Sequence, residues 1–201
     1  MPDHLLTPEN LPTRLQRCAV RVMRWFGWRV HFAPLPGPRG VLIFYPHTSN
    51  WDFPIAMLAK LAIGIPVRWL GKQALFSNFL LDRFMRRLGG EPVERQNSTG
   101  AIERLGQRIR NADWYWLALA PEGTRKYSDS WRSGFYHIAR AADVPLALAF
   151  IDYPSRTIGV LDYVQLSGDI DADLESIRAA YAGRRGYRAD DAAPIVFQAK
   201  E

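Results

Sequence analysis

The chain has 201 residues, of which 48% are hydrophobic, and this content suits one globular domain and excludes a chain that is disordered throughout. Its 26 Lys and Arg residues against 20 Asp and Glu residues give a net charge of +6, which indicates a polyanionic partner such as anionic lipid, a phosphorylated substrate or nucleic acid. The single cysteine, Cys18, excludes an intrachain disulfide and favours a reducing compartment, so the expected location is the cytoplasm.

Residues 11–26 predict a basic amphipathic helix. Four arginines fall within an arc of about 80° in a projection of 100° per residue, and an apolar stripe lies beside them. Such a helix either lies in a lipid interface, with its arginines at the lipid phosphates, or packs its stripe on the domain core. The sequence leaves both alternatives open. The arginines are Arg14, Arg17, Arg21 and Arg24, and the stripe consists of Leu11, Leu15, Cys18, Val22, Trp25 and Phe26.

No membrane-spanning helix and no signal peptide are expected. The longest apolar stretch after residue 45 is interrupted by Pro54 and Lys60, and it falls short of the ~20 residues that a membrane span needs. The first residues lack the long apolar core and the cleavage site of a signal peptide. A connector rich in Pro and Gly at 33–40 then divides the chain into an N-terminal membrane-associating segment, 1–40, and an α/β domain, 41–201.

Strand and helix patterns alternate through the second part of the chain. The expected fold class is therefore α/β, a single layered domain whose largely parallel mixed sheet is flanked by helices, preceded by the N-terminal amphipathic helix. The last two strands follow each other directly, which predicts an antiparallel addition to the sheet. Strands are expected at 41–45, 66–70, 114–120, 145–153 and 157–166, and helices near 77–88, 99–110, 134–142 and 171–182.

Polar residues follow two of these strands directly, at the edge of the sheet where α/β proteins usually bind ligands. His47 and Asp52 come after the first strand, and "PEGTRK" comes after 114–120. A histidine can act as a general base near neutral pH, and a carboxylate can fix its tautomer. On a helix the two positions would be about 140° out of alignment, so they can meet only if His47 lies in the loop before the helix. Alternatively, Asp52 caps that helix and His47 is structural.

These segments together resemble the glycerolipid acyltransferase family, which includes the lysophosphatidic acid acyltransferases. The run from His47 to Asp52 matches the family's H-x-x-x-x-D motif, and Pro121 to Arg125, "PEGTR", matches its second signature. Pro46 and Ala120 replace residues that the family often has there, and "HTSNWD" and "WRSGF" depart from the commonest pattern of the phosphatidate-forming enzymes. The resemblance covers about residues 41–150 and includes "GKQALF" (71–76), "GGEPVER" (89–95), "WRSGF" (131–135) and "VPLALAF" (144–150).

The resemblance implies that an acyl group moves from acyl-CoA or acyl carrier protein to the hydroxyl of a lysophospholipid such as 1-acylglycerol-3-phosphate. His47 is then the general base and Asp52 orients it, while the substrate supplies the nucleophile. Arg125 is the first candidate to bind an acceptor phosphate, and backbone N–H groups of residues 122–124 are candidates to stabilise the oxyanion. The substrate-binding residues implied by the family pattern are Lys72, Arg95, Glu122, Gly123, Thr124 and Arg125.

No cofactor or metal is expected, because the remaining histidines show no metal-ligand spacing. The expected partners are the acceptor lipid, the acyl donor and an anionic membrane surface, with the protein peripheral on the inner face of the cell membrane. Nucleic acid is not expected, since most tryptophans fall in apolar strand or helix patterns. Two alternatives remain: an acyltransferase of the same family with an acceptor that lacks glycerophosphate, and a non-catalytic basic protein that binds anionic membranes or nucleic acid.

Overall fold

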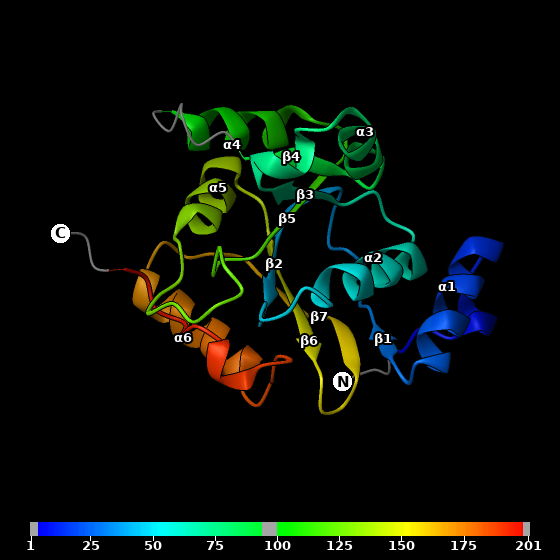
Figure 1. The fold of residues 1–201 in the computed structure, drawn as a ribbon. Helices are drawn as coiled ribbons and strands as arrows, with labels where there is room; N and C mark the ends of the chain where they lie inside the picture. Colours follow the sequence, from blue (N-terminus) through cyan, green and yellow to red (C-terminus); the bar gives the residue numbers. More distant parts are fainter. Residues whose placement is uncertain (1–3, 94–99, 199–201) are drawn as a thin grey trace.

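A computed structural model describes residues 4–93 and 100–198 of the chain. One mixed sheet forms its centre, and its strands are β1 (Arg29–His31), β2 (Arg39–Tyr45), β3 (Arg68–Gly71), β4 (Gly90–Pro92), β5 (Tyr115–Leu119), β6 (Leu146–Asp152) and β7 (Thr157–Val164). The strand order is β1-β7-β6-β2-β5-β3-β4 (Figure 1). β6 and β7 pair antiparallel and the other neighbours pair parallel, which confirms the predicted fold class and the antiparallel addition.

Helices cover both faces of the sheet. Figure 1 shows α4, α5 and α6 on one side and α2 on the other, with α1 packed beyond α2. The α-helices are α1 (Arg14–Trp25), α2 (Asp52–Ile63), α3 (Phe79–Arg87), α4 (Ala101–Asn111), α5 (Gly134–Ala142) and α6 (Ile170–Tyr181). Short 3₁₀ helices are η1 (Pro8–Asn10), η2 (Gln73–Phe76) and η3 (Ala189–Asp191).

Each strand and helix predicted from the sequence is present, with ends that differ by a few residues. Two short strands, β1 and β4, were not predicted, because three residues are too few to show an alternating pattern. β1 lies in the first 40 residues and pairs with β7. Gly159 makes this pairing possible, since a Cβ there would come 1.8 Å from the carbonyl oxygen of His31.

The side chains of β6 alternate between the two faces of the sheet. In β6, Leu146, Leu148 and Phe150 point into the core beneath α4, α5 and α6, whereas Ala147 and Ala149 point to the opposite face. This division follows from the period of two along a strand. Ala147 and Ala149 therefore leave room on the face beneath α2, beside larger side chains such as Trp116 and Phe44.

α1 packs against α2 through a face that differs from its apolar stripe. Its buried residues are Gln16, Ala19, Val20 and Met23. Thr13 and Gln16 form a capping box at its start, and the amide of Gln16 also donates to the carbonyl of Ile63 at the end of α2. Most of the stripe remains in solvent: the exposed fractions are 61% for Leu15, 83% for Trp25 and 57% for Phe26.

Candidate active site

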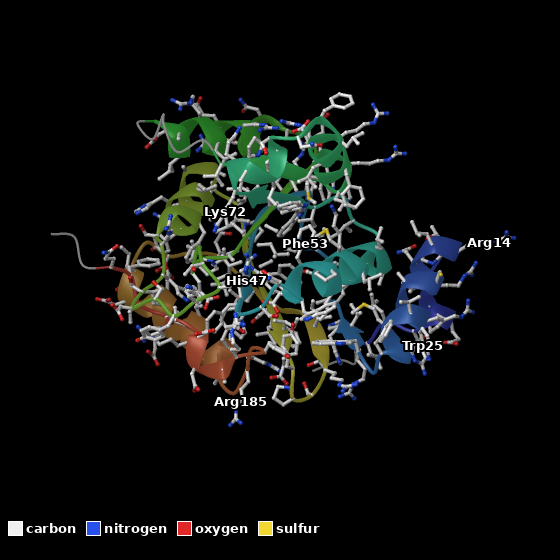
Figure 2. The ribbon with its side chains drawn as sticks, in the orientation of Figure 1. Arg14, Trp25, His47, Phe53, Lys72 and Arg185 are labelled. Carbon is white, nitrogen blue, oxygen red and sulfur yellow. The ribbon has the colours of Figure 1, made fainter. Side chains whose placement is uncertain are left out.

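His47 and Asp52 meet at the carboxyl end of β2. The strand ends at Tyr45 and α2 begins at Asp52, so His47 lies in the intervening loop, which is the arrangement that a contact requires. His47 Nδ1 lies 3.0 Å from Asp52 Oδ2 (Figure 2 shows the position of His47). The side chain of His47 is 20% exposed and that of Asp52 is 1% exposed. The pair is therefore buried on the carboxylate side and accessible on the imidazole side.

Both carboxylate oxygens of Asp52 are used within the site. Oδ2 also accepts the backbone N–H of Ser49 at 2.9 Å, and Oδ1 accepts the hydroxyl of Tyr153 at 2.7 Å. The start of α2 has no side-chain cap, so the alternative in which Asp52 caps the helix is wrong. Instead, the N–H of Ser49 and the hydroxyl of Tyr153 fix the carboxylate in the orientation that holds His47.

Tyr153 is a residue of this site that the sequence reasoning missed. It directly follows β6, so it is a third polar residue at the same edge of the sheet, and that position was the available signal. Its ring contacts Trp28 and Tyr187 edge to face, at centroid distances of 5.1 Å and 5.3 Å. Burial and the bond to Asp52 raise the pKa of Tyr153 above its ordinary value. The phenol therefore stays protonated and remains a hydrogen-bond donor.

Glu122 links the second motif to the first. Its Oε2 accepts the backbone N–H of His47 at 2.6 Å, and its Oε1 accepts the backbone N–H of Ala193 at 3.0 Å. Burial raises the pKa of Glu122 to about 7. Both oxygens bind backbone groups, so in this structure Glu122 fastens the His47 loop to the C-terminal part of the chain.

The rest of the second motif forms a tight turn. Gly123 has a φ of +66°, in the left-handed region that favours glycine, and its N–H donates to the carbonyl of Ala120. That N–H is engaged, so it is not a free oxyanion donor in this structure. Thr124 Oγ1 accepts the N–H of Lys126 at 3.2 Å, and Arg125 is exposed.

The C-terminal segment, residues 181–193, completes the edge of the sheet. The backbone N–H of Arg188 donates to Thr48 Oγ1 at 3.2 Å, and the hydroxyl of Tyr45 donates to the carbonyl of Ala193 at 3.0 Å. The hydroxyl of Tyr181 donates to the carbonyls of Ile43 and Ala149, which lie on neighbouring strands. These bonds hold the segment across the ends of β2 and β6.

A mainly apolar cavity of about 190 Å³ lies between α2 and the sheet, and His47 and Asp52 are part of its wall. Small residues of three strands, Ala118, Ala149 and Gly159, form part of the lining. A second cavity of about 1250 Å³ lies beyond it, and both cavities are lined by Met57, Lys60, Val67 and Leu70.

The predicted basic residues stand apart from the smaller cavity. Lys72 precedes η2 and is exposed, and neither Lys72 nor Arg125 lines the cavity (Figure 2 labels Lys72). Arg95 lies outside the described residues. Within the described part of the chain, no three His, Cys, Asp or Glu side chains are grouped as metal ligands would be, and no helix has the length and apolar content to cross a membrane.

The comparisons with known proteins agree with this architecture. The family model described as Acyltransferase matches residues 16–150, more than half of the chain, and the chain therefore belongs to the Acyltransferase family of enzymes. The fold is similar to that in the crystal structure of the 1-acyl-sn-glycerophosphate acyltransferase PlsC from Thermotoga maritima, with a TM-score of 0.54 and 15% sequence identity. That match covers 86% of this chain and 81% of the PlsC chain. The search of curated proteins gave no match.

Proposed function

We propose that the protein transfers a fatty acyl group from a thioester, acyl-CoA or acyl carrier protein, to the hydroxyl of a lysophospholipid such as 1-acylglycerol-3-phosphate. The observation that carries this proposal is the contact of 3.0 Å between His47 Nδ1 and Asp52 Oδ2 in the wall of an apolar cavity. Membership of the Acyltransferase family supports the reaction class. The acceptor class is supported by the likeness of the fold to PlsC, a 1-acyl-sn-glycerophosphate acyltransferase.

His47 acts as the general base in this proposal. Asp52 is a hydrogen-bond acceptor, so the proton of the neutral imidazole resides on Nδ1, and the lone pair resides on Nε2. Nε2 takes the proton of the acceptor hydroxyl as its oxygen attacks the thioester carbonyl. When the tetrahedral intermediate collapses, the C–S bond breaks and the imidazolium returns the proton to the thiolate. Asp52 stabilises the imidazolium between these two steps.

The cavity beside His47 suits the acyl chain of a substrate. Its lining is mainly apolar, and Ala118, Ala149 and Gly159 leave the face of the sheet open beneath α2. An alkyl chain gains roughly 0.8 kcal/mol for each CH₂ group that leaves water. The apolar wall therefore favours an acyl chain, and in this proposal the reacting carbonyl lies beside the His47 imidazole at the polar edge of the sheet.

A phosphate on the acceptor needs fixed positive charge near the base, and Arg125 is our candidate. It follows Glu122 by three residues, and Glu122 is bonded to the backbone of His47, so the turn brings Arg125 to the same edge of the sheet. A guanidinium can bind phosphate with two parallel hydrogen bonds. Lys72 and Arg95 have supporting roles in this proposal.

The exposed stripe of α1 suits a membrane surface. Leu15, Trp25 and Phe26 face solvent beside the arginines of the same helix, and the contact with α2 uses other residues. Aromatic residues beside arginines match the interfacial region of a bilayer, where the rings sit at headgroup depth and the cations meet lipid phosphates. We propose that α1 holds the enzyme on an anionic membrane, peripheral on its inner face, where the acceptor lipid resides.

The test is an acylation assay with purified protein, labelled palmitoyl thioesters and a panel of acceptors with and without phosphate. We expect wild-type product with the lysophospholipid and a loss of at least ~10²-fold in turnover for His47→Ala. The matched control is His137→Ala, which changes an exposed histidine of α5 and should retain full activity. No consumption of thioester by the wild type, or near-normal activity of His47→Ala, would contradict the proposal. Acylation only of acceptors without phosphate would contradict the acceptor and the role of Arg125.

A further inference from the structure

α3 presents three large apolar side chains to solvent within two helical turns. The exposed fractions are 77% for Phe79, 73% for Leu80 and 56% for Phe84. No residue of this helix is fully buried. Single exposed apolar residues are normal on a protein surface, but a contiguous group of large ones marks an interaction site. We name Phe79, Leu80 and Phe84 the α3 apolar patch.

Two arginines share the exposed face with this patch. At 100° per residue, Phe79, Arg83 and Arg87 form one row along the helix, and Leu80 and Phe84 form the next, so all five lie within an arc of about 140°. Among the described residues, Arg83 and Arg87 take part in no ion pair, whereas Arg86 on the flank pairs with Asp82 at 2.8 Å. Bulky apolar groups and free cations are therefore interleaved on one surface.

This combination matches the interfacial region of an anionic bilayer. Apolar side chains gain free energy among acyl chains, while arginines on flexible stems reach the phosphates above them. A second copy of the chain is a poorer occupant, because a symmetric contact through this face would bring the two sets of arginines together. The charge on the surface thus favours lipid over self-association.

The position of α3 in the fold is consistent with docking on the same membrane surface as α1. Figure 1 shows α1 and α3 toward one side of the molecule, with α2 between them, and α6 on the other side. α2 is fastened to both neighbours: it packs against α1, and its Lys60 Nζ donates to the carbonyl of Leu88, which follows α3, at 2.5 Å. The two helices with exposed apolar and basic side chains therefore flank α2, and α2 covers the cavity beside His47.

We propose that α3 is a second membrane-docking element. The α3 apolar patch inserts among the acyl chains of an anionic bilayer, and Arg83 and Arg87 bind its phosphates. This inference rests on the proposed function, in which α1 holds the enzyme at a membrane. It adds that contact at two helices fixes the orientation of α2, and hence of the apolar cavity, relative to the bilayer.

The test uses environment-sensitive fluorophores on single cysteines of the full chain. Cys18, exposed on α1, reports on that helix in the otherwise native protein. Phe84→Cys in a Cys18→Ser background reports on α3, and Ile170→Cys in the same background is the control, since Ile170 is exposed at the start of α6. The vesicles contain equal parts of phosphatidylcholine and phosphatidylglycerol, with brominated acyl chains as quenchers.

We expect quenching of the probes at 18 and 84 and none at 170. Quenching at 18 without quenching at 84 overturns the role of α3 and leaves the proposed function intact. No quenching at either position overturns membrane docking by both helices. Shielding of the probe at 84 that depends on protein concentration in the absence of vesicles shows self-association and also overturns the proposal.

A second measurement tests the energetics with variants. Replacement of the α3 apolar patch by alanine at all three positions should weaken vesicle partitioning by ~10-fold or more, because three large apolar groups no longer leave water. Arg83→Gln with Arg87→Gln should weaken binding to the anionic vesicles, with little change on pure phosphatidylcholine. Circular dichroism and thermal melting verify that the variants are folded. Unchanged partitioning of folded variants contradicts the proposal.

Discussion

The loop that carries His47 and the loop that carries Glu122 both follow strands of the same sheet, but they are built differently. In the first loop the imidazole lines a cavity, and it is held by a buried carboxylate that two other donors fix in place. In the second loop the buried carboxylate binds only backbone N–H groups, and the charged side chains of Arg125 and Lys126 are exposed. In the proposed function, the first loop therefore performs the proton transfer, and the second loop supports the first and meets the acceptor.

The largest expected effect comes from the first loop. Asp52→Asn should lower kcat by about 10²–10³-fold, because the amide can donate to Nδ1 and thereby place the imidazole proton on Nε2, where the base is needed. Steady-state acylation kinetics give the value. Asp162→Asn, which changes an exposed carboxylate of β7, is the matched control and should be neutral. An Asp52→Asn variant with normal kcat would exclude the proposed base.

In the second loop, a substitution of Glu122 should change the free energy of unfolding. Burial raises the pKa of Glu122 from its ordinary value of 4.5 to about 7. Between these pH values the folded protein binds the proton more tightly than the unfolded chain, so this group makes stability fall as the pH rises through that range. Glu122→Gln should reduce the dependence of the free energy of unfolding on pH in this range. It should also lower the free energy of unfolding by about 1–3 kcal/mol, since the amide nitrogen cannot accept a backbone N–H. Urea unfolding at several pH values measures this dependence, and the same pH dependence in the variant and the wild type contradicts the prediction.

A substitution of Arg125 should change the binding of the acceptor more than the rate of the chemical step. Arg125→Gln should raise KM for a phosphate-bearing acceptor by about 10-fold, which corresponds to the loss of one charge-assisted contact of ~1.4 kcal/mol. KM for an acceptor without phosphate should change little. The neighbouring Lys126→Gln serves as control, because it removes one exposed positive charge from the same turn. Equal changes in KM for the two acceptors would show that Arg125 does not bind the phosphate.

The smallest effect is expected at Tyr153. Tyr153→Phe removes the hydroxyl that donates to Asp52 Oδ1 and keeps the ring between Trp28 and Tyr187. We expect kcat to fall by about threefold to tenfold with KM unchanged, as for the loss of one hydrogen bond of ~1 kcal/mol. Tyr187→Phe should leave kcat unchanged. If kcat of Tyr153→Phe equals that of the wild type, the phenol does not position the catalytic pair.

The sequence predicted the elements and the principal pair because both leave local signals. Apolar runs of five to ten residues with turn residues between them indicated the strands, and polar residues directly after two strands indicated the site. β1 and β4 were too short to show a pattern. The packing face of α1 was missed because its buried residues include the polar Gln16 and the small Ala19, which weaken the apolar pattern on that face. The bonds from Tyr153 to Asp52 and from Glu122 to Ala193 join residues 101 and 71 positions apart, and no spacing rule reaches that far.

The bond between Glu122 and Ala193 has a consequence for protein engineering. The family model ends at residue 150, so a chimera assembled from blocks of two relatives would naturally be joined near that point. Yet Thr48, Asp52 and Glu122 all depend on partners supplied after residue 150. A chimera that exchanges only the matched block will combine these three residues with partners from the other relative. The last fifty residues must therefore be exchanged together with the first motif for the chimera to keep its activity.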